Sequence, residues 1–270
     1  MDRDKILNRY KENEEDRLIA SKILDRINLS KTKNRIESSD FLSMHGKNIA
    51  LYILNSLKET NYKFFGEDKN LDKQMLILYP ENKAEIFENN RYDYSSLISI
   101  IRIELPDELK GTYEYRDYLS GIMKLGIERE TFGDILVYND RADVIVEKEV
   151  VKFLLLELPN LIRFKRCKIE EININELEEK IEEKEEINII STSLRLDNIV
   201  AELARCSRSK AKEIIETDRV TINYENENRL TRQIKENDII VIRGKGKFIF
   251  KEVIGETKSN KLRLVIEHYI

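Results

Sequence analysis

Cysteine and histidine are scarce in this chain. Cys167 and Cys206 are the only cysteines among its 270 residues, and His45 and His268 are the only histidines. Two cysteines cannot build a disulfide framework, so the sequence favours a reducing compartment. Neither cysteine stands at metal-ligand spacing from a histidine or the other cysteine, and no Ser–His or Cys–His nucleophile set can be assembled. We therefore expect no metal site and no catalytic residue.

Long apolar runs and glycine-rich loops are missing as well. The best apolar stretch, residues 150–158, holds Lys152 and Glu157 and is far shorter than the run of about 20 residues that spans a bilayer. The first residues, Met-Asp-Arg-Asp-Lys, lack the apolar core of a signal peptide. No Gly-x-Gly-x-x-Gly or Walker sequence occurs, which argues against a nucleotide or methyl-donor cofactor. We expect a cytoplasmic protein with no cofactor and no membrane partner.

Net charge differs between the two parts of the chain. The whole chain has a formal charge of −4, from 47 basic and 51 acidic residues, which alone argues against a nucleic-acid partner. Residues 191–270, however, hold 16 Lys and Arg against 12 Asp and Glu, whereas residues 1–190 hold 31 against 39. A segment of net charge +4 is therefore hidden by a remainder of −8. The overall charge does not exclude RNA as a partner.

The patterning divides the chain into four parts. With 41% apolar residues, 270 residues suffice for two or three folded domains. Residues 1–70 show helical spacing and predict a helical N-terminal region, with one helix at about 45–57 and a capping region at Ser39-Asp40. Residues 71–174 predict a mixed domain, residues 175–190 an acidic linker, and residues 191–270 a basic domain. Residues 168–190 hold nine Glu and three Lys without Gly or Pro, which favours a short, stiff helical connection.

Short apolar runs separated by turn residues organise the middle region. A strand is predicted at 74–79, ended by Pro80. From residue 97 onward the pattern predicts a strand at 97–105, a helix at 115–125, strands at 135–138 and 142–146, a helix at 149–158 and a strand at 166–172. This β-α-β-β-α-β order is ferredoxin-like, as in RRM-like RNA-binding domains. The order alone does not prove RNA binding, and the aromatic signature of a base-stacking sheet face is absent.

Residues 191–270 carry the most informative pattern. Apolar residues at i, i+3, i+4 and i+7 spacing predict a helix: Leu196, Ile199, Val200 and Leu203. Ser193 can cap the start of this helix. A second helix is predicted from Ser207 or Ser209 to about residue 217, with Arg208 and Lys212 on one flank. Strands are predicted at 220–223, 239–242 and 248–250, with a turn at 235–238.

Four motifs follow one another between residues 193 and 247. They are Leu-Arg-Leu-Asp at 194–197, Ser-Arg-Ser-Lys-Ala at 207–211, Val-Thr-Ile-Asn at 220–223, and Asn-Asp at 237–238 before an apolar strand. In this order and spacing they resemble the αL RNA-binding module of ribosomal small-subunit protein four, the S-four or S4 domain. The resemblance implies that the first turns of both helices face RNA, where helix N-termini and guanidinium groups bind phosphate oxygens.

The RNA-binding residues that this resemblance implies lie on both helices, the following strand and the 243–247 loop. They are Arg195, Ser207, Arg208, Ser209, Lys210, Lys212, Asn223, Arg243, Lys245 and Lys247. Asp197 is expected to hold Arg195 or a neighbouring backbone donor in place. Gly244 and Gly246 either make a turn or let the backbone approach RNA closely. Relatives commonly place an aromatic residue between these glycines, where this chain has Lys245.

Three motifs in the middle region extend the resemblance. Arg-Asp-Tyr-Leu at 116–119, Leu-Gly-Ile-Glu-Arg-Glu at 125–130 and Gly-Asp-Ile at 133–135 resemble the YlmH family of bacterial proteins. That family implies an α+β chain: an N-terminal helical region, an RRM-like domain and a C-terminal S4 domain. Ser120 and Tyr115 depart from the family, which usually has Gly and His there. Arg116, Asp117, Arg129 and Asp134 could suggest acid–base chemistry, but we expect a structural ion-pair network.

The resemblance implies a non-catalytic RNA-binding factor of translation. The expected partners are structured RNA, namely rRNA and tRNA, on the large ribosomal subunit, and relatives act on stalled large subunits that still hold peptidyl-tRNA. A second, weaker RNA contact is expected in the middle domain at Arg129, Arg163, Lys165 and Arg166. We expect a monomer. Two alternatives remain open: an RNA-modifying enzyme, such as a pseudouridine synthase or methyltransferase, targeted by its S4 domain, and a cell-division-associated interaction protein.

Overall fold

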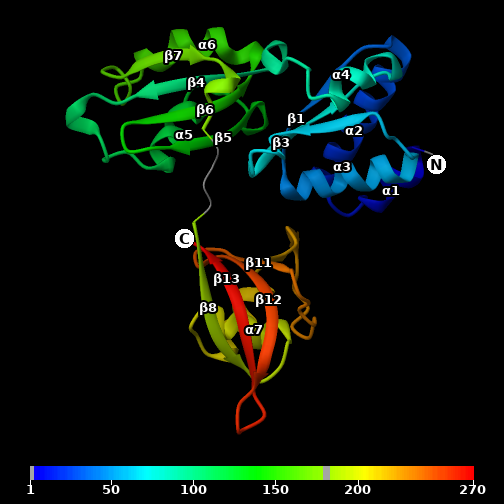
Figure 1. Ribbon diagram of the computed structural model, residues 1–270, viewed down its shortest axis with the longest axis vertical. Helices are drawn as coiled ribbons and strands as arrows, with labels where there is room; N and C mark the ends of the chain where they lie inside the picture. Colours follow the sequence, from blue (N-terminus) through cyan, green and yellow to red (C-terminus); the bar gives the residue numbers. More distant parts are fainter. Residues whose placement is uncertain (1–2, 179–182) are drawn as a thin grey trace. The chain divides into compact units, whose positions relative to one another are not determined.

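The chain forms two compact units. A computed structural model describes residues 3–178 and 183–270, and the units comprise residues 1–180 and 181–270. Figure 1 shows the elements of each unit in sequence colours. The structure is mixed α+β, as the sequence predicts. Among the described residues, no helix is both long enough and apolar enough to cross a membrane.

The N-terminal part of the first unit is a three-stranded sheet with helices on one face. Its helices and strands are α1 (Arg3–Arg9), α2 (Glu14–Lys33), β1 (Glu37–Ser43), α3 (Met44–Leu57), β2 (Tyr62–Phe65) and β3 (Lys73–Leu78). The strands pair antiparallel in the order β1-β3-β2. Apolar residues of the helices, such as Ile23 and Ile53, share a core with Phe64 and Leu76 from the strands. This core fixes the helices against the sheet.

The prediction of a helical region over residues 1–70 is confirmed for α1, α2 and α3 but omits the strands β1 and β2. The predicted helix at 45–57 is confirmed as α3, and the predicted strand at 74–79 is confirmed as β3. β3 pairs with both β1 and β2, so a boundary after residue 70 would cut through a sheet. Ser39 and Asp40 lie within β1 and cap no helix, whereas Ser43 caps α3 by accepting a hydrogen bond from the amide of Gly46. β1 has the polar sequence Glu-Ser-Ser-Asp-Phe-Leu-Ser, which lacks the apolar alternation that would predict a strand.

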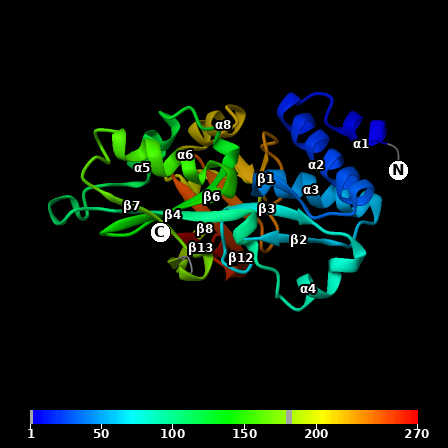
Figure 2. The ribbon, with the colours of Figure 1, turned by 90° about the horizontal axis from the view of Figure 1, so that it is seen from above.

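The middle region has the ferredoxin-like order that the sequence predicts. Its main elements are β4 (Ile98–Glu104), α5 (Tyr115–Met123), β5 (Phe132–Val137), β6 (Arg141–Glu147), α6 (Val151–Glu157) and β7 (Lys168–Ile172). All neighbouring strands are antiparallel, in the order β5-β6-β4-β7. Helices α5 and α6 lie on one side of this sheet (Figure 2). Their buried residues Tyr118, Ile122 and Leu154 pack with Ile101 and Val144.

The other face of this sheet belongs to a core shared with the N-terminal sheet. Ile100 of β4 and Ile145 of β6 alternate with the helix-facing residues and pack in one cluster with Phe41 of β1 and Met75 of β3. The short helix α4 (Ala84–Glu88) adds Phe87 to the same cluster. Because apolar burial is continuous from one sheet to the other, residues 3–178 hold together as one body.

A buried carboxylate strengthens the junction between the two sheets. Asp134 of β5 accepts hydrogen bonds from the backbone amides of Asp72 and Lys73, at 2.8 and 3.0 Å. Beside it, a Cβ on Gly133 would come within 3.0 Å of the Phe41 ring. A side chain at position 133 would therefore fit only if the Phe41 ring moved by a few tenths of an ångström.

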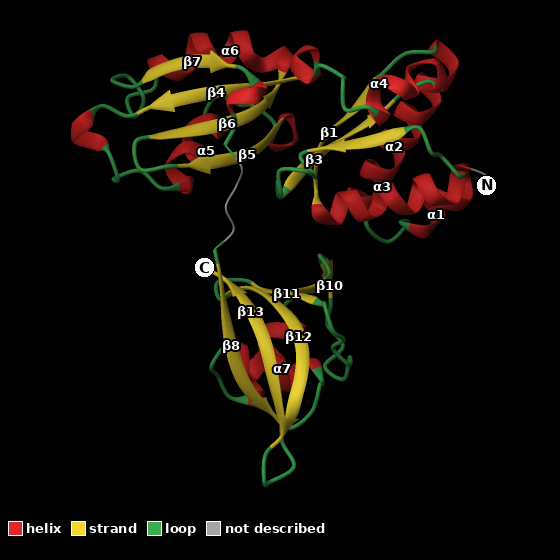
Figure 3. Ribbon diagram, in the orientation of Figure 1, coloured by secondary structure: helices red, strands yellow, loops and turns green. Residues whose placement is uncertain are grey.

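The second unit is a six-stranded antiparallel sheet with two helices packed on one face. Its elements are β8 (Lys184–Ser191), α7 (Leu196–Leu203), α8 (Arg208–Glu216), β9 (Val220–Ile222), β10 (Glu225–Asn226), β11 (Ile239–Ile242), β12 (Gly246–Glu256) and β13 (Leu262–Tyr269). The strand order is β10-β9-β11-β12-β13-β8. Figure 3 shows β8, β13 and β12 side by side with α7 behind them. The predicted helices and the strands at 220–223, 239–242 and 248–250 are confirmed.

The predicted helical connection over the glutamate-rich segment is wrong. Residues 168–172 form β7, and Lys184–Ser191 forms β8, which pairs along its length with β13. Ile187 and Ile189 alternate along β8 and pack against the core of the second unit, so tertiary burial outweighs the charge of the flanking glutamates. The acidic linker at 175–190 thus ends inside a sheet, and its residues 179–182 lie outside the described part of the chain.

The shared core of the first unit predicts the effect of truncating Phe41, which is 2% exposed. Replacing a buried phenylalanine by alanine typically costs about 3–5 kcal/mol, so Phe41→Ala should lower the free energy of unfolding of this unit by that amount. Urea unfolding followed through methyl NMR signals from residues 3–178 measures the change. Phe153→Ala, at a side chain that is 45% exposed on α6, is the matched control. Equal effects of the two substitutions would contradict the shared core.

Candidate nucleic-acid interface

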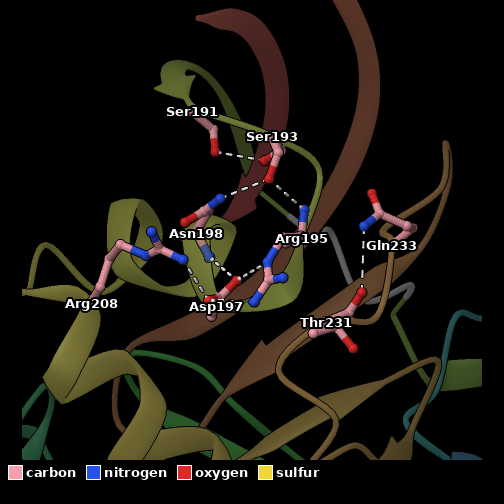
Figure 4. A network of polar contacts seen from close by, with 8 residues as sticks. All are labelled: Ser191, Ser193, Arg195, Asp197, Asn198, Arg208, Thr231 and Gln233. Atoms are coloured by element: carbon pink, nitrogen blue, oxygen red, sulfur yellow. Dashed lines mark hydrogen bonds and ion pairs between the residues drawn. The ribbon is translucent and has the colours of Figure 1, made fainter.

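The turn before α7 is held by a network of small polar side chains. The hydroxyl of Ser193 accepts hydrogen bonds from the amide of Arg195 at 3.3 Å and from the Asn198 side chain at 2.7 Å. Ser191 donates its hydroxyl to the Ser193 carbonyl at 2.8 Å (Figure 4). Ser193 therefore braces the turn without standing at the N-cap, which is Arg195. The expectation that Ser193 is the N-cap of α7 is therefore wrong, because Ser193 lies two residues before the N-cap.

Asp197 holds two arginines at the start of α7. Its carboxylate accepts hydrogen bonds from Nε and Nη2 of Arg195, both at 3.0 Å, and from Nη2 of Arg208 at 2.7 Å. The Asp197 side chain is 9% exposed, whereas that of Arg208 is 62% exposed. Burial alone would raise the pKa of the Asp197 carboxyl, but the two guanidinium groups outweigh burial and hold this pKa below its usual value. The Asp197 clamp, comprising these three residues, fixes the arginines while leaving guanidinium donors exposed.

The backbone amides at the start of α7 are used within the protein. The amide of Leu196 donates to the carbonyl of Arg232 at 2.8 Å, and the amide of Asp197 donates to the carbonyl of Leu230 at 3.2 Å. These amides cannot also bind phosphate, which corrects the expectation for the N-terminus of this helix. An anion at the start of α7 would therefore have to be bound by the arginine side chains.

Helix α8 places the predicted cations Lys210 and Lys212 on an exposed surface. Ser207 is its N-cap and accepts a hydrogen bond from the amide of Lys210, as the sequence predicts. Ser209 is exposed. Lys210 pairs with Glu213 at 2.7 Å and Lys212 with Glu216 at 3.6 Å. Both pairs are exposed, so they are weak and can open towards another anion.

The 243–247 loop combines exposed cations with a structural requirement for glycine. Arg243 and Lys245 are exposed. Gly246 has φ of +134°, and a Cβ there would lie 2.7 Å from Nε2 of His268. The backbone at Gly246 therefore lies close to the imidazole ring of His268. Lys247 lies with its ammonium 4.0 Å from the centre of the Tyr269 ring.

Asn223 takes part in holding the fold. Its amide group donates to Asp238 at 2.7 Å, and its carbonyl oxygen accepts from the amide of Ile239 at 2.9 Å. Its φ of +53° lies in the left-handed region, which asparagine tolerates better than most residues. These contacts give the predicted RNA-binding residue Asn223 a role in positioning the strand ends.

A second carboxylate clamp lies in the segment after β10. Glu227 is 5% exposed, accepts two side-chain hydrogen bonds from Arg229 at 2.6 and 2.8 Å, and accepts one from Arg232 at 3.1 Å. The hydrogen bond from Arg229, together with that from Arg232, lowers the pKa of Glu227 to about 2 against the opposing effect of burial. We call these three residues the Glu227 clamp. The sequence analysis does not predict this clamp. The one sequence signal for it is the spacing of Glu227 from the arginines that follow it two and five residues later.

The predicted secondary contact in the middle domain divides into two kinds of residue. Arg129 donates to the carbonyls of Phe132 and Gly133, and Arg163 donates to the Asp117 carbonyl and the Ser120 hydroxyl. Arg129 therefore braces the start of β5, and Arg163 braces α5. Lys165 is exposed, and Arg166 forms an exposed pair with Glu108 at 3.1 Å.

Arg116, Asp117 and Asp134 make contacts with different partners, and Arg129 is bonded to the carbonyls given above. Arg116 pairs with Glu114 at 3.2 Å, and Asp117 pairs with Arg163 at 2.9 Å. Asp134 binds the amides at the junction of the two sheets. Each charged group thus has a separate structural contact.

Metal-binding side chains do not gather in the part of the chain that the structure describes. No group of three or more His, Cys, Asp or Glu residues there could hold a metal ion. Cys167 and Cys206 are free thiols, and burial raises the pKa of the Cys167 thiol. His45 pairs with Asp16 at 2.8 Å, and His268 with Glu185 at 3.0 Å.

The lowered pKa of Glu227 predicts a pH-dependent stability. A free glutamate titrates near 4.5, whereas Glu227 in the folded protein titrates near 2, so the stabilisation is complete above about pH 4.5 and decreases as the pH falls towards 2. The free energy of unfolding of the second unit should therefore fall more steeply between about pH 5 and 3 in the wild type than in Glu227→Gln. Urea unfolding followed through methyl NMR signals of this unit measures both slopes. The exposed Glu236→Gln is the control, and equal slopes in wild type and Glu227→Gln would refute the prediction.

Two family models agree with this architecture. The family model described as the putative RNA-binding domain in YlmH matches residues 90–176, and the S4 domain model matches residues 194–240. The "Ribosome-associated protein quality control protein P2" of Bacillus subtilis (strain 168) is 22% identical over 253 residues, which are 94% of this chain and 95% of that protein. The solved "Cell division protein ylmH from Streptococcus pneumoniae" has a TM-score of 0.47 and 22% identity, and covers 60% of this chain and 93% of its own. The chain therefore contains a YlmH-type putative RNA-binding domain, followed by a C-terminal S4 domain.

Proposed function

We propose that the chain is a non-catalytic RNA-binding factor of translation that binds rRNA and tRNA on the large ribosomal subunit. Its sharpest form is a role in the quality control of stalled subunits that still hold peptidyl-tRNA. The observation that carries the proposal is the Asp197 clamp, which presents Arg195 and Arg208 from a basic domain. The name of the B. subtilis relative supports the ribosome as the place of action.

The clamp suits recognition of an RNA backbone. The planar guanidinium group of arginine presents several N–H donors in a geometry that fits phosphate. Less conformational entropy is lost on binding when this group is already held in place. The Asp197 carboxylate supplies that fixation, since it is buried and bonded to both guanidinium groups. A-form RNA is recognised largely through its shape and its backbone, because side chains cannot enter its deep, narrow major groove.

The middle domain supports at most a contact away from its sheet face. The sheet surface on which RRM domains stack bases is partly buried in the core shared with the N-terminal sheet. Next to that core, Arg102 donates two hydrogen bonds of 2.7 Å to the buried Asp143. Of the four residues expected to make the second contact, Lys165 and Arg166 in the segment before β7 are exposed and available to RNA. Such a weak second contact would raise affinity through effective concentration.

Charge reversal on α8 tests the RNA surface. Arg208→Glu combined with Lys212→Glu should abolish co-sedimentation with isolated large ribosomal subunits at low salt, because two phosphate contacts become repulsive. The matched control, Lys251→Glu with Lys258→Glu, changes the same net charge on β12 and the following loop and should pellet like the wild type. Unchanged pelleting of the Arg208 and Lys212 variant would show that this surface is not the binding site.

An isotope-release assay tests the non-catalytic part of the proposal. Pseudouridine formation or methylation at C5 of uridine releases tritium from RNA labelled at that position. We expect no release above background when the protein is incubated with labelled large-subunit RNA, with and without S-adenosylmethionine. Turnover in either reaction would replace this proposal by the RNA-modifying alternative.

A further inference from the structure

We propose that the RNA-binding surface of the S4 domain extends from the Asp197 clamp to the Glu227 clamp, where Arg229 binds a further RNA phosphate. This inference rests on the proposed function and deepens it, since it assigns a second phosphate site to the same partner. In this second site Arg229 is the contacting residue, and Arg232 is a positioning residue that acts through Glu227.

The two clamps lie on backbone segments that are bonded to each other. The amide of Leu196 donates to the carbonyl of Arg232 at 2.8 Å, and the amide of Ile234 donates to the carbonyl of Leu194 at 2.8 Å. Arg195 and Gln233 form an antiparallel bridge between these segments. Figure 4 shows Thr231 and Gln233 beside Arg195. The loop that carries the second clamp is thus fixed directly against the first.

The charges of the second clamp favour an anion at Arg229. Glu227 accepts from both arginines, and Asp238 lies 3.6 Å from Arg232, so two carboxylates face Arg232 and one faces Arg229. The Arg232 side chain is 26% exposed, whereas that of Arg229 is 71% exposed. Arg229 donates hydrogen bonds to Glu227 from Nε and Nη2. The other N–H groups of its guanidinium group, including those of Nη1, can donate to an external anion.

The arrangement at Arg229 repeats that at Arg208. In both cases a buried carboxylate with two arginine partners binds one side of an exposed guanidinium group. The Asp197 clamp has one carboxylate for two arginines and is therefore net positive, so a phosphate can neutralise it. At the Glu227 clamp Asp238 balances Arg232, so binding of a phosphate there depends on the exposed donors of Arg229. Two such groups on adjoining segments form a track that a polyphosphate backbone can follow.

Salt-dependent binding of single variants tests the second site. Binding to isolated large ribosomal subunits is measured by pelleting over a range of salt concentrations for the wild type, Arg229→Gln, Arg208→Gln and the control Lys251→Gln. Loss of one phosphate contact should lower the log–log salt slope by roughly 0.9 and weaken binding at low salt by about tenfold. We expect this change for Arg229→Gln and for Arg208→Gln, and none for Lys251→Gln.

A paired variant removes the risk that Arg229→Gln merely leaves Glu227 buried without its partner. Glu227→Gln with Arg229→Gln takes away both charges, and it should lose the same slope and the same affinity as Arg229→Gln alone. Wild-type affinity and slope in both Arg229 variants, with a loss in Arg208→Gln, would overturn the second site but keep the proposed function. Failure of the wild type to bind large subunits at low salt would overturn the proposed function itself, and the second site with it.

Discussion

A buried carboxylate that must be neutralised organises the C-terminal domain. Asp197 is largely removed from water, and a charged group there is stable only if cations and hydrogen bonds surround it. Arg195 and Arg208 meet this need, and Asn198 adds its backbone amide at 3.1 Å. The same contacts join the first turn of α7 to α8. The requirement that stabilises the acid therefore also fixes the cations that face outward.

The first unit follows a different constraint, the burial of sheet faces. Its two sheets each have helices on one face and must cover the other, and they do so together with Phe41, Ile100 and Ile145 in one cluster. This solution uses a surface on which related folds bind nucleic acid. Arg129 and Arg163 are likewise bonded to backbone carbonyls within the unit. We therefore propose that the S4 domain makes the main RNA contact and the first unit at most a weaker one.

Local sequence signals suffice for those helices and strands whose own apolar spacing or capping residue indicates their structure. The apolar spacing around Ile199 predicted α7, the Ser207 cap predicted α8, and alternating isoleucines predicted β4. Elements that depend on distant partners were missed. β8 is predicted as part of a charged helix because it continues the glutamate-rich segment 168–190. Its pairing with β13 and the packing of Ile187 and Ile189 make it a strand.

The candidate site shows the same limit. Asp197 was expected to hold Arg195, and the contact is present, but its partner Arg208 is eleven residues away and joins through the fold. The Glu227 clamp could not be predicted, because its burial results from the packing of the 227–234 segment and not from any local periodicity.

We propose that the two carboxylate clamps of the S4 domain bind RNA on the large ribosomal subunit. Cross-linking of protein to RNA in cells, with both the RNA sites and the cross-linked peptides identified, tests it most directly. The account predicts cross-links to large-subunit rRNA or to tRNA from peptides that contain residues 193–212 and 227–247. Cross-links confined to the first unit, or to messenger RNA alone, would contradict it.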